Sequence, residues 1–501
     1  MLEKINKYYQ EDKLRFILLL ALFARLIAVI FSKGYGMHDD HFLIIEASKS
    51  WVDGYDYNNW LPWNQKNPTP SGHSFFYVGI HYLIFLFFKL ISFENPDYQM
   101  YVIRLFHAVY SLLIISLSYK ITKKLYAEKQ AVTVAWILAL AWFMPFLSVR
   151  NLVEIVSIPP MLASIWYIIK DDKQTFKKYF LAGLIGGLAF SIRFQTSLFI
   201  GGIGLTLLIQ KQLKQAVYYG IGAIFSVALI QGGIDIFIWG KPFTEFGEYV
   251  RYNLTHKNDY IHGDWFNYIL VLSGMLIPPF GLFLFFGMFN TRKKLLILFI
   301  PTLIFFLFHS YFPNKQERFI FPVLPQFIIL GIIGIDIWIN GKFNKNIYKK
   351  IFKWSFIFAI IINFILLPFV TTTYSKKARV ESMLYLYKKD STDAILVDAM
   401  GKSGYKMVPR FYMGKWPAVN IIRKHSDYKK YRENSTQKYV LFLGNDSLQT
   451  RVKRVEQTQQ EKLKFEKAFA PGLVDWILYS INKHNANDTI FVYSKISNTG
   501  N

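Results

Sequence analysis

The sequence predicts an all-α polytopic membrane protein with a small C-terminal α/β soluble domain. Hydrophobic residues make up 53% of the 501 residues, and they form long blocks separated by short basic clusters. A bilayer accommodates each such block as a helix, because a helix satisfies its own backbone polar groups in hydrocarbon. After residue 372, short β-rich runs alternate with Lys-rich helical stretches. We therefore expect a transmembrane domain over 1–372 and a soluble domain over 373–501.

About 11 apolar blocks are candidate transmembrane helices, once tilt and flanking residues are allowed for. They lie at roughly 13–31, 101–119, 131–148, 152–169, 179–192, 194–209, 216–238, 265–287, 295–310, 320–339 and 352–372. The first lacks a small-residue cleavage site, which indicates a retained anchor. The stretch 75–92 is also apolar. We interpret it as an interfacial or re-entrant helix, because a further span there would place one basic connector on the wrong side.

The formal net charge of +25 comes mainly from the connectors and the C-terminal tail. Basic connectors favour the cytoplasmic side, which predicts a cytoplasmic N-terminus and an outer (periplasmic or luminal) C-terminal domain. A charge distributed in this way indicates membrane lipid as a partner and not nucleic acid. The clusters that set this orientation are Lys4 to Lys13, Lys120 to Lys124, Lys170 to Lys178, Lys211 to Lys214, Arg292 to Lys294 and Lys342 to Lys350. Cysteine is absent, which excludes disulfides and thiolate metal sites.

The first outward loop, 32–74, contains an acidic motif, Met37-His38-Asp39-Asp40-His41-Phe42, followed by Glu46. Adjacent carboxylates can bind a cation, or one can act as a base while the other orients it. An ordinary solvated loop explains them equally well. His38 and His41 are candidate metal ligands, although histidines in loops are usually not.

A second outward cluster, 313–325, holds Lys315, Glu317 and Arg318 between two apolar blocks. Charged residues next to hydrocarbon pair with each other or serve a ligand, and Lys and Arg together suit a phosphate. Snorkelling at the membrane surface is the alternative. Arg193, at another outward helix end, is either an anchor or a ligand contact.

A third outward stretch runs from Asp235 to Trp265. It includes Gly240-Lys241-Pro242 and the pair Tyr252 and Asn253, which could form the polar rim of a site. By its pattern alone it is a loop.

Taken together and in this order, the clusters resemble those of the Alg9-like and PIG-B-like mannosyltransferases, glycosyltransferase family 22, of the GT-C membrane architecture. Residues 37–42 are similar to the family's His-Pro-Asp-Glu-like stretch, and residues 314–319 to its His-Lys-Glu-Glu-Arg-Phe-like stretch. Asp235 and the residues up to Trp265 are similar to the stretch between these motifs. The resemblance covers roughly 10–340 and leaves out the tail after 373.

The chain also departs from the family pattern. Met37 stands for the leading His, His38 and Asp40 stand for the Pro and Glu, and Asn314 and Gln316 replace a His and a Glu. Ser71-Gly72-His73-Ser74 stands where an Arg-Ser pair is typical. With these departures, a distant member could use another sugar or acceptor.

The resemblance implies transfer of a sugar, first of all mannose, from a polyprenyl-phosphate donor to a lipid-linked or glycan acceptor. Its phosphate leaves as an anion, so inversion needs a single carboxylate base, for which we choose Asp39, with Asp40 orienting it or binding acceptor. Lys315, Arg318 and Arg193 would bind the donor phosphate. The substrate-binding candidates are His41, Glu46, Trp60, Asp235, Tyr252, Asn253 and Glu317. No cofactor is required by this chemistry, although Asp39 and Asp40 could hold a divalent cation, Mg or Mn.

Two other classes of protein remain open at this point. A transporter or flippase of lipid-linked glycans explains the spans and basic sites, but it predicts two related halves with broken helices. A scaffold or receptor leaves the Lys and Arg near the bilayer without a role.

Overall fold

The computed structural model describes residues 2–496 except 67, 258, 260–261, 292–294, 342–345, 390–393, 401–406, 431–436 and 482–487. Two compact units are present. The first unit comprises Met1–Val29, Asn59–Ile80 and Arg104–Thr371, and the second comprises Ile30–Asn58, His81–Ile103 and Thr372–Asn501. The predicted basic cluster Arg292 to Lys294, and residues 342–345 of the cluster Lys342 to Lys350, lie outside the described residues.

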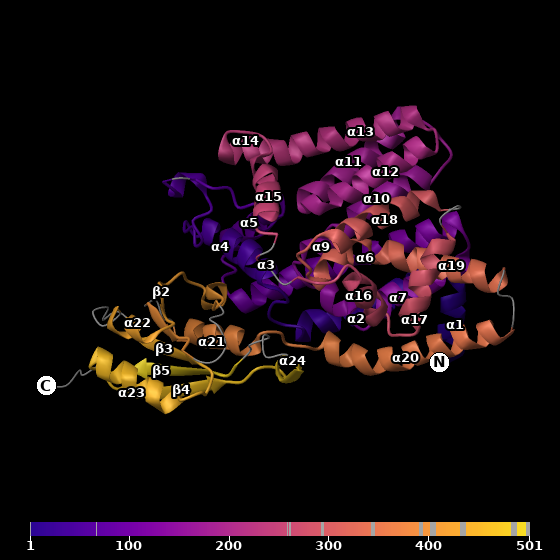
Figure 1. Cartoon of the computed structure of the whole chain (residues 1–501). Helices are drawn as coiled ribbons and strands as arrows, with labels where there is room; N and C mark the ends of the chain where they lie inside the picture. The colour runs from indigo at the N-terminus through magenta and orange to yellow at the C-terminus, as the bar shows by residue number, and fades with distance from the viewer. Residues whose placement is uncertain are drawn as a thin grey trace. The chain divides into compact units, whose positions relative to one another are not determined.

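Up to residue 371 the described chain is helical, with loops between the helices (Figure 1). Its helices are α1 (Leu2–Glu11), α2 (Lys13–Phe31), α3 (His38–His41), α4 (Ala47–Val52), α5 (Phe75–Leu90), α6 (Pro96–Leu125), α7 (Glu128–Leu140), α8 (Met144–Ser148), α9 (Val153–Val156), α10 (Ile158–Ile169), α11 (Phe176–Ile192), α12 (Ser197–Ile209), α13 (Leu213–Val227), α14 (Gly233–Trp239), α15 (Thr244–Thr255), α16 (Asn267–Met275), α17 (Phe280–Asn290), α18 (Leu296–Tyr311), α19 (Leu324–Asn340) and α20 (Asn346–Thr371). Shorter turns are η1 (Phe42–Glu46), η2 (Pro62–Asn64), η3 (Phe194–Thr196), η4 (Ala228–Gly232) and η5 (Glu317–Val323).

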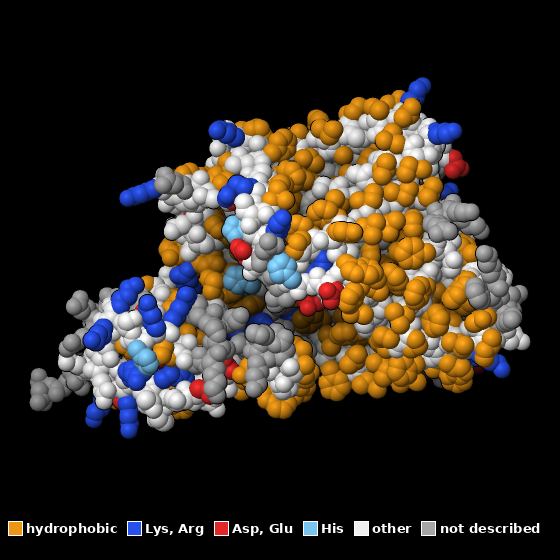
Figure 2. Space-filling view, viewed as in Figure 1, with side chains coloured by type: hydrophobic (Ala, Val, Ile, Leu, Met, Phe, Trp, Pro, Cys, Tyr) orange, Lys and Arg blue, Asp and Glu red, His pale blue; other side chains and the backbone are white. Residues whose placement is uncertain are grey.

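Five of the described helical stretches are long and apolar enough to cross a membrane. They are Lys13–Phe31, Pro96–Leu125, Leu213–Trp239, Glu317–Asn340 and Asn346–Thr371. Shorter apolar helices add to them, and hydrophobic side chains cover broad areas of the helical part (Figure 2). The predicted polytopic helical membrane protein is confirmed, whereas the total of about 11 spans stays a prediction.

Two of the predicted spans are interrupted. The helix expected over 131–148 stops at Leu140 and resumes as α8 at Met144. The helix expected over 265–287 is the pair α16 and α17, which meet at an angle of 116°. Pro278 and Pro279 lie at this break, and neither has an N–H group to continue a helix. The stretch 75–92 forms α5, whose 16 residues are fewer than the roughly 20 that a span needs.

Glycines let two helix pairs of the first unit pack at very short range. In Figure 1, α11 and α13 run alongside one another. A Cβ atom on Gly183 of α11 would lie 2.0 Å from the carbonyl oxygen of Tyr219 in α13. In the same way, a Cβ atom on Gly334 of α19 would lie 1.7 Å from the carbonyl oxygen of Gly287 in α17. Close backbone approach through small residues is how helices associate in lipid, where hydrophobic burial provides no drive.

A buried arginine joins helices α2, α6 and α7 of this unit. The Arg25 side chain of α2 is fully buried, and its Nε donates to Ser111 Oγ of α6 at 2.8 Å. Its Nη atoms donate to the carbonyls of Leu138 and Ala139, at the C-terminal end of α7. These carbonyls have no partner within the helix, so the guanidinium satisfies them while its own charge is solvated.

The C-terminal part of the second unit is the predicted small α/β domain. Its elements are α21 (Lys377–Lys388), β1 (Ile395–Asp398), η6 (Arg410–Met413), β2 (Val419–Ile422), α22 (His425–Lys430), β3 (Tyr439–Leu443), α23 (Leu448–Gln459), β4 (Leu463–Phe469), α24 (Leu473–Ile481) and β5 (Ile490–Lys495). The sheet order is β2-β1-β3-β5-β4. Strands β1, β2 and β3 are parallel, and β5 runs antiparallel to β3 and β4. Lys and Arg side chains gather over this domain (Figure 2).

Candidate active site

Two of the predicted phosphate-binding residues, Arg193 and Arg318, meet at one buried carboxylate in the first unit. Arg193 Nη1 lies 2.8 Å from Glu154 Oε1, and Arg318 Nε lies 3.5 Å from the same oxygen. Glu154 is fully buried and both arginines are almost fully buried. Both guanidinium groups also lie over the ring of Phe319, at 5.4 and 5.5 Å from its centre. We call Glu154, Arg193 and Arg318 the arginine cluster.

Helix ends deliver all three side chains of the arginine cluster. Glu154 is in the first turn of α9, and Arg193 follows the last residue of α11 with an extended backbone. Arg318 is in η5, directly before α19. Membrane helices end near the bilayer surface, where a charged group costs less free energy than in the hydrocarbon core. The fold therefore brings three segments that are distant in the sequence to one polar site.

The arginine cluster has buried donors that are not used within the described residues. Its two guanidinium groups share one carboxylate oxygen, Glu154 Oε1. Arg193 Nε and Nη2 are buried and have no hydrogen-bond partner among the described residues. Arg318 Nε donates to Gln316 Oε1 at 2.9 Å. Buried donors of this kind suit an anion with several oxygens, such as a phosphate.

Lys315 lies close to the cluster in sequence, but its ammonium is already bound. It donates to the carbonyl oxygens of His309 at 2.8 Å and Ser310 at 2.6 Å, and also to that of Phe312. These carbonyls belong to the end of α18, so Lys315 caps that helix. Burial lowers the pKa of Lys315. To bind the donor phosphate as predicted, the Lys315 ammonium would have to replace one of these carbonyl oxygens by a phosphate oxygen.

The stretch from Asp235 to Trp265 reaches the late cluster as well. His262 pairs with Asn314 in an isolated antiparallel bridge. A Cβ atom on Gly263 would lie 2.7 Å from Lys315 Cγ, so only glycine fits against the lysine stem. Glu317 is exposed, whereas Tyr268 donates from its hydroxyl to the carbonyl of Gln316 at 3.1 Å. The sequence predicted these two stretches separately, and the fold brings them together.

Asp235 is fully buried in a second acidic group. Gln231 Nε2 donates to Asp235 Oδ1 at 3.1 Å and to Glu245 Oε2 at 2.8 Å. Glu245 also accepts from Trp239 Nε1 and from the backbone N–H of Phe75, the first residue of α5. Burial, and then the charge of Asp235, raises the pKa of Glu245 to about 8. This acid pair joins α14, α15 and α5, and the substrate role of Asp235 stays a prediction.

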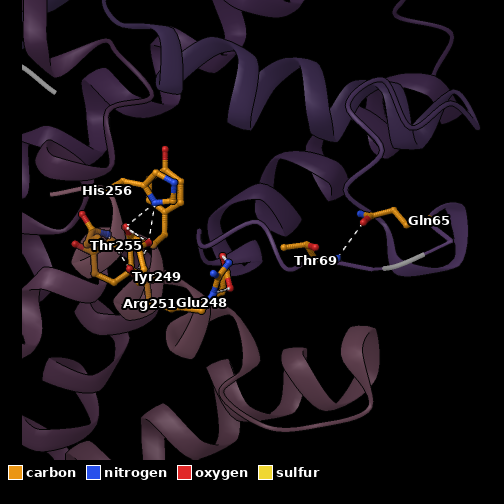
Figure 3. Close-up of polar contacts among 9 residues, drawn as sticks. Gln65, Thr69, Glu248, Tyr249, Arg251, Thr255 and His256 are labelled. Atoms are coloured by element: carbon orange, nitrogen blue, oxygen red, sulfur yellow. Dashed lines mark hydrogen bonds and ion pairs between the residues drawn. The ribbon is translucent and has the colours of Figure 1, made fainter. Parts of the chain in front are cut away.

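Tyr252 and Asn253 lie on α15. The ring of Tyr252 is partly exposed and stacks on His256 at 4.2 Å, and Asn253 Nδ2 donates to the carbonyl of Tyr249 within the helix. Figure 3 shows the α15 contacts as one group and the Gln65 to Thr69 contact as a separate one. Trp60, which precedes Gln65 in the chain, stacks on Phe75 with 6.0 Å between the ring centres. Neither aromatic side chain is fully buried, which leaves ring surface for a ligand.

The acidic motif of the first outward loop belongs to the second unit. Asp40 is buried, and its carboxylate accepts from the backbone N–H of Met37 at 2.9 Å and of Gly36 at 3.1 Å. His41 and Glu46 are buried too, with 3.3 Å between His41 Nε2 and Glu46 Oε1. Asp39 is partly exposed. Of the two adjacent acids, Asp40 therefore binds the loop backbone, whereas Asp39 is the more exposed.

No group of three or more His, Asp or Glu side chains that could hold a metal ion occurs within the described part of the chain. Asp39 and Asp40 come closest in sequence, but Asp40 already accepts two backbone N–H groups. The possible divalent cation at these two residues stays a prediction.

Comparison with known proteins decides the family. Residues 16–397 match the Alg9-like mannosyltransferase family. The chain belongs to the Alg9-like mannosyltransferase family. This membership favours the glycosyltransferase interpretation over the transporter and receptor interpretations.

The relatives and structural neighbours agree with this membership. GPI mannosyltransferase 3 of Saccharomyces cerevisiae is 23% identical over 186 residues, which cover 34% of this chain and 29% of the yeast protein. The Candida glabrata protein of the same name is 24% identical over 197 residues, 36% and 30% of the two chains. The matched segments thus span less than a third of these relatives.

Two solved structures share the fold. ArnT from Cupriavidus metallidurans bound to undecaprenyl phosphate superposes with a TM-score of 0.63 at 12% identity, over 97% of this chain and 98% of that one. The Archaeoglobus fulgidus oligosaccharyltransferase in the apo form gives a TM-score of 0.53 at 11% identity, over 85% and 69% of the chains. The GT-C architecture implied by the sequence is confirmed.

Sequence reasoning did not single out Glu154, Gln231 or Glu245 as site residues. Glu154 had a signal, because it is an acid at the start of a long apolar block and such acids need a cation. Gln231 and Glu245 had none, since an amide within a span and an acid in a loop are common by themselves. Only the fold places them around Asp235.

Proposed function

We propose that this glycosyltransferase moves a mannose-like sugar from a polyprenyl-phosphate donor to a lipid-linked or glycan acceptor on the outer face of its membrane, with inversion. The observation that carries the proposal is the arginine cluster, where two buried guanidinium groups share one carboxylate. Such a site attracts a diester phosphate that carries one negative charge. Likeness to ArnT, solved with undecaprenyl phosphate, supports a polyprenyl carrier.

The reaction needs one base and one group of cations. The acceptor hydroxyl oxygen attacks the anomeric carbon, and the bond from that carbon to the phosphate oxygen breaks with the electron pair going to the phosphate. Asp39 takes the hydroxyl proton, while Arg193 and Arg318 stabilise the charge that develops on the phosphate. Lys315 is a third phosphate contact, which forms only if its ammonium breaks a hydrogen bond with a carbonyl oxygen of α18. The remaining predicted substrate contacts, among them Trp60, Tyr252 and Glu317, serve sugar or acceptor.

Asp39 belongs to the second unit and the arginine cluster to the first, so the base and the phosphate contacts are two separate assignments. The partly exposed Asp39 supports the role of base, since the neighbouring Asp40 is committed to the loop backbone. Tests therefore have to address the two units independently.

The first experiment measures sugar transfer by the purified chain with a radiolabelled polyprenyl-phosphate mannose. Asp39→Asn is expected to lower kcat by about 100-fold or more with little change in donor KM, because a base acts only in the transition state. Asp172→Asn, a change of an exposed acid in the α10–α11 loop, is the matched control. Normal transfer by Asp39→Asn would remove it as the base.

The second experiment addresses the phosphate. Arg318→Ala is expected to raise donor KM roughly tenfold or more, because a hydrogen bond to a charged group contributes about 1.5–3 kcal/mol. Arg251→Ala, on the exposed side of α15, is the control. If the labelled donor binds Arg318→Ala as tightly as the parent protein, the phosphate site lies elsewhere.

A further inference from the structure

A segment of the C-terminal domain packs directly on the acidic loop, and both lie in the second unit. The backbone N–H of Phe411 donates to Glu46 Oε1 at 3.1 Å. The ring of Tyr412 stacks on His41, with 5.4 Å between ring centres and 10° between planes. Tyr35 also stacks on His41, with 4.6 Å between ring centres and 15° between planes. The imidazole of the acidic motif therefore stacks with two tyrosines, one from the loop and one from the tail.

These contacts are buried and close around charged groups. Glu46 is fully buried, and His41, Phe411 and Tyr412 are each 1% exposed. Burying a carboxylate and an imidazole costs free energy unless they are paired. Here Glu46 Oε1 has a polar neighbour from each segment, His41 Nε2 from the loop at 3.3 Å and the Phe411 N–H from the tail at 3.1 Å. Both segments thus form the surroundings of this buried carboxylate, so the two are expected to order together.

The same tail segment also contacts the part of the loop that follows α4. Trp416 Nε1 donates to Asp53 Oδ2 at 2.8 Å, just after α4. The guanidinium of Arg410 lies 5.8 Å from the ring centre of Tyr55 and 5.1 Å from that of Tyr57. Residues 410–416 thus contact the loop at two separate places, which fixes its orientation and not only its position.

We propose that residues 410–416 are a positioning element, the clasp, which holds Asp39 in place through His41 and Glu46. The argument rests on the proposed role of Asp39 as the base. Helix α3 has only four residues, and a single turn is not stable without tertiary contacts. Asp40 fixes the turn on its N-terminal side through the N–H groups of Gly36 and Met37, and His41, which stacks on Tyr412, fixes it on its C-terminal side. Asp39, between them, stays partly exposed.

This position gives the C-terminal domain a role in the reaction. A proton acceptor that is misplaced by about 1 Å loses roughly 100-fold in rate, so its supporting contacts matter as much as its chemistry. The clasp also lies beyond residue 397, where the match to the family ends. The family pattern alone does not identify it.

The test compares Tyr412→Leu with Tyr412→Phe, because both side chains are apolar and only phenylalanine keeps the stacked ring. Tyr412→Leu is expected to lower kcat about tenfold or more, with donor KM within about twofold, since positioning of the base affects the transition state and not donor binding. Tyr412→Phe is expected to retain the parent kcat. Tyr493→Leu removes a similarly buried ring from β5 and is the matched control for damage to the domain.

Amide hydrogen exchange over residues 36–46 provides a readout that does not need activity. Tyr412→Leu is expected to accelerate exchange there, and Tyr412→Phe and Tyr493→Leu are expected to leave it unchanged. The clasp is overturned if Tyr412→Leu changes neither exchange nor kcat, if exchange rises without loss of kcat, or if Tyr493→Leu has the same effects. Failure of the base assignment is separate, because it is seen in Asp39→Asn while exchange over the loop still reports the clasp.

Discussion

At the scale of single residues, Glu154 is the side chain on which the arginine cluster depends. Removing one member of a buried ion pair costs about 3–5 kcal/mol, because the remaining charge stays buried without a partner. Glu154→Gln removes the carboxylate charge that both guanidinium groups of the cluster contact. We expect it to destabilise the protein by a few kcal/mol, measured as thermal unfolding in one detergent.

The matched comparison is Glu248→Gln, which breaks the Arg251 pair on α15, where the Arg251 side chain is 58% exposed. Pairs of that kind contribute about 0–1 kcal/mol. Equal losses of stability in the two variants would show that Glu154 is not the counter-charge of the cluster.

Lys315 illustrates what residue types alone do not reveal. A Lys three residues before an Arg suits a phosphate, and the sequence predicted both as donor contacts. In the fold, Lys315 caps α18 with its ammonium and Arg318 pairs with Glu154. The two cations differ because the end of α18 offers carbonyl oxygens to one and α9 offers a carboxylate to the other. The sequence does not locate the end of α18 or the start of α9 accurately enough to predict which partner each cation has.

At the scale of elements, the acid pair ties α15 to α14 and to the start of α5. Gln231 donates to both carboxylates, and Glu245 also accepts from Trp239 and from the N–H of Phe75. Because the folded pKa of Glu245 is raised to about 8, the protonated acid stabilises the folded junction. That contribution is complete below the ordinary glutamate pKa of about 4.3 and is lost as the pH rises through about 8.

We therefore expect the thermal stability of the protein to fall between about pH 5 and pH 8, by at most about 1.4 kcal/mol for each pH unit, and to level off above pH 8. Glu245→Gln keeps the shape and cannot ionise, so this part of the pH dependence is expected to disappear. Glu248→Gln, three residues further along the same helix, is expected to keep it. The same pH dependence in Glu245→Gln as in the parent would rule out this acid as its source.

At the scale of the whole molecule, the sequence was sufficient for the class of fold and insufficient for the construction of the site. Long apolar blocks determined the membrane helices, and the β-rich runs near 394–398 and 439–444 became β1 and β3. The break between α16 and α17 was missed because an apolar block reads the same whether its helix is straight or bent.

The partners of the acidic loop could not be predicted for a different reason. His41 and Phe411 are 370 positions apart, and no local pattern marks a contact over such a distance. The order of the motifs along the chain gave the family, whereas the burial of Asp40 and the partial exposure of Asp39 needed the fold.

The orientation of the whole molecule in its membrane is the remaining expectation from charge, and the composition allows a direct test. Positive connectors predict that Lys124, at the end of α6, lies in the cytoplasm and that Lys453, on α23, lies outside. Both side chains are exposed, and the chain has no cysteine to give a background signal. In intact cells, a membrane-impermeant maleimide is expected to label Lys453→Cys strongly and Lys124→Cys at no more than about a tenth of that level, since a bilayer excludes a charged reagent. After permeabilisation both variants are expected to react, which shows that each thiol is accessible. Labelling of Lys124→Cys in intact cells, with Lys453→Cys protected, would invert the topology and would place the acidic loop on the cytoplasmic side, where the proposed outer-face reaction does not take place.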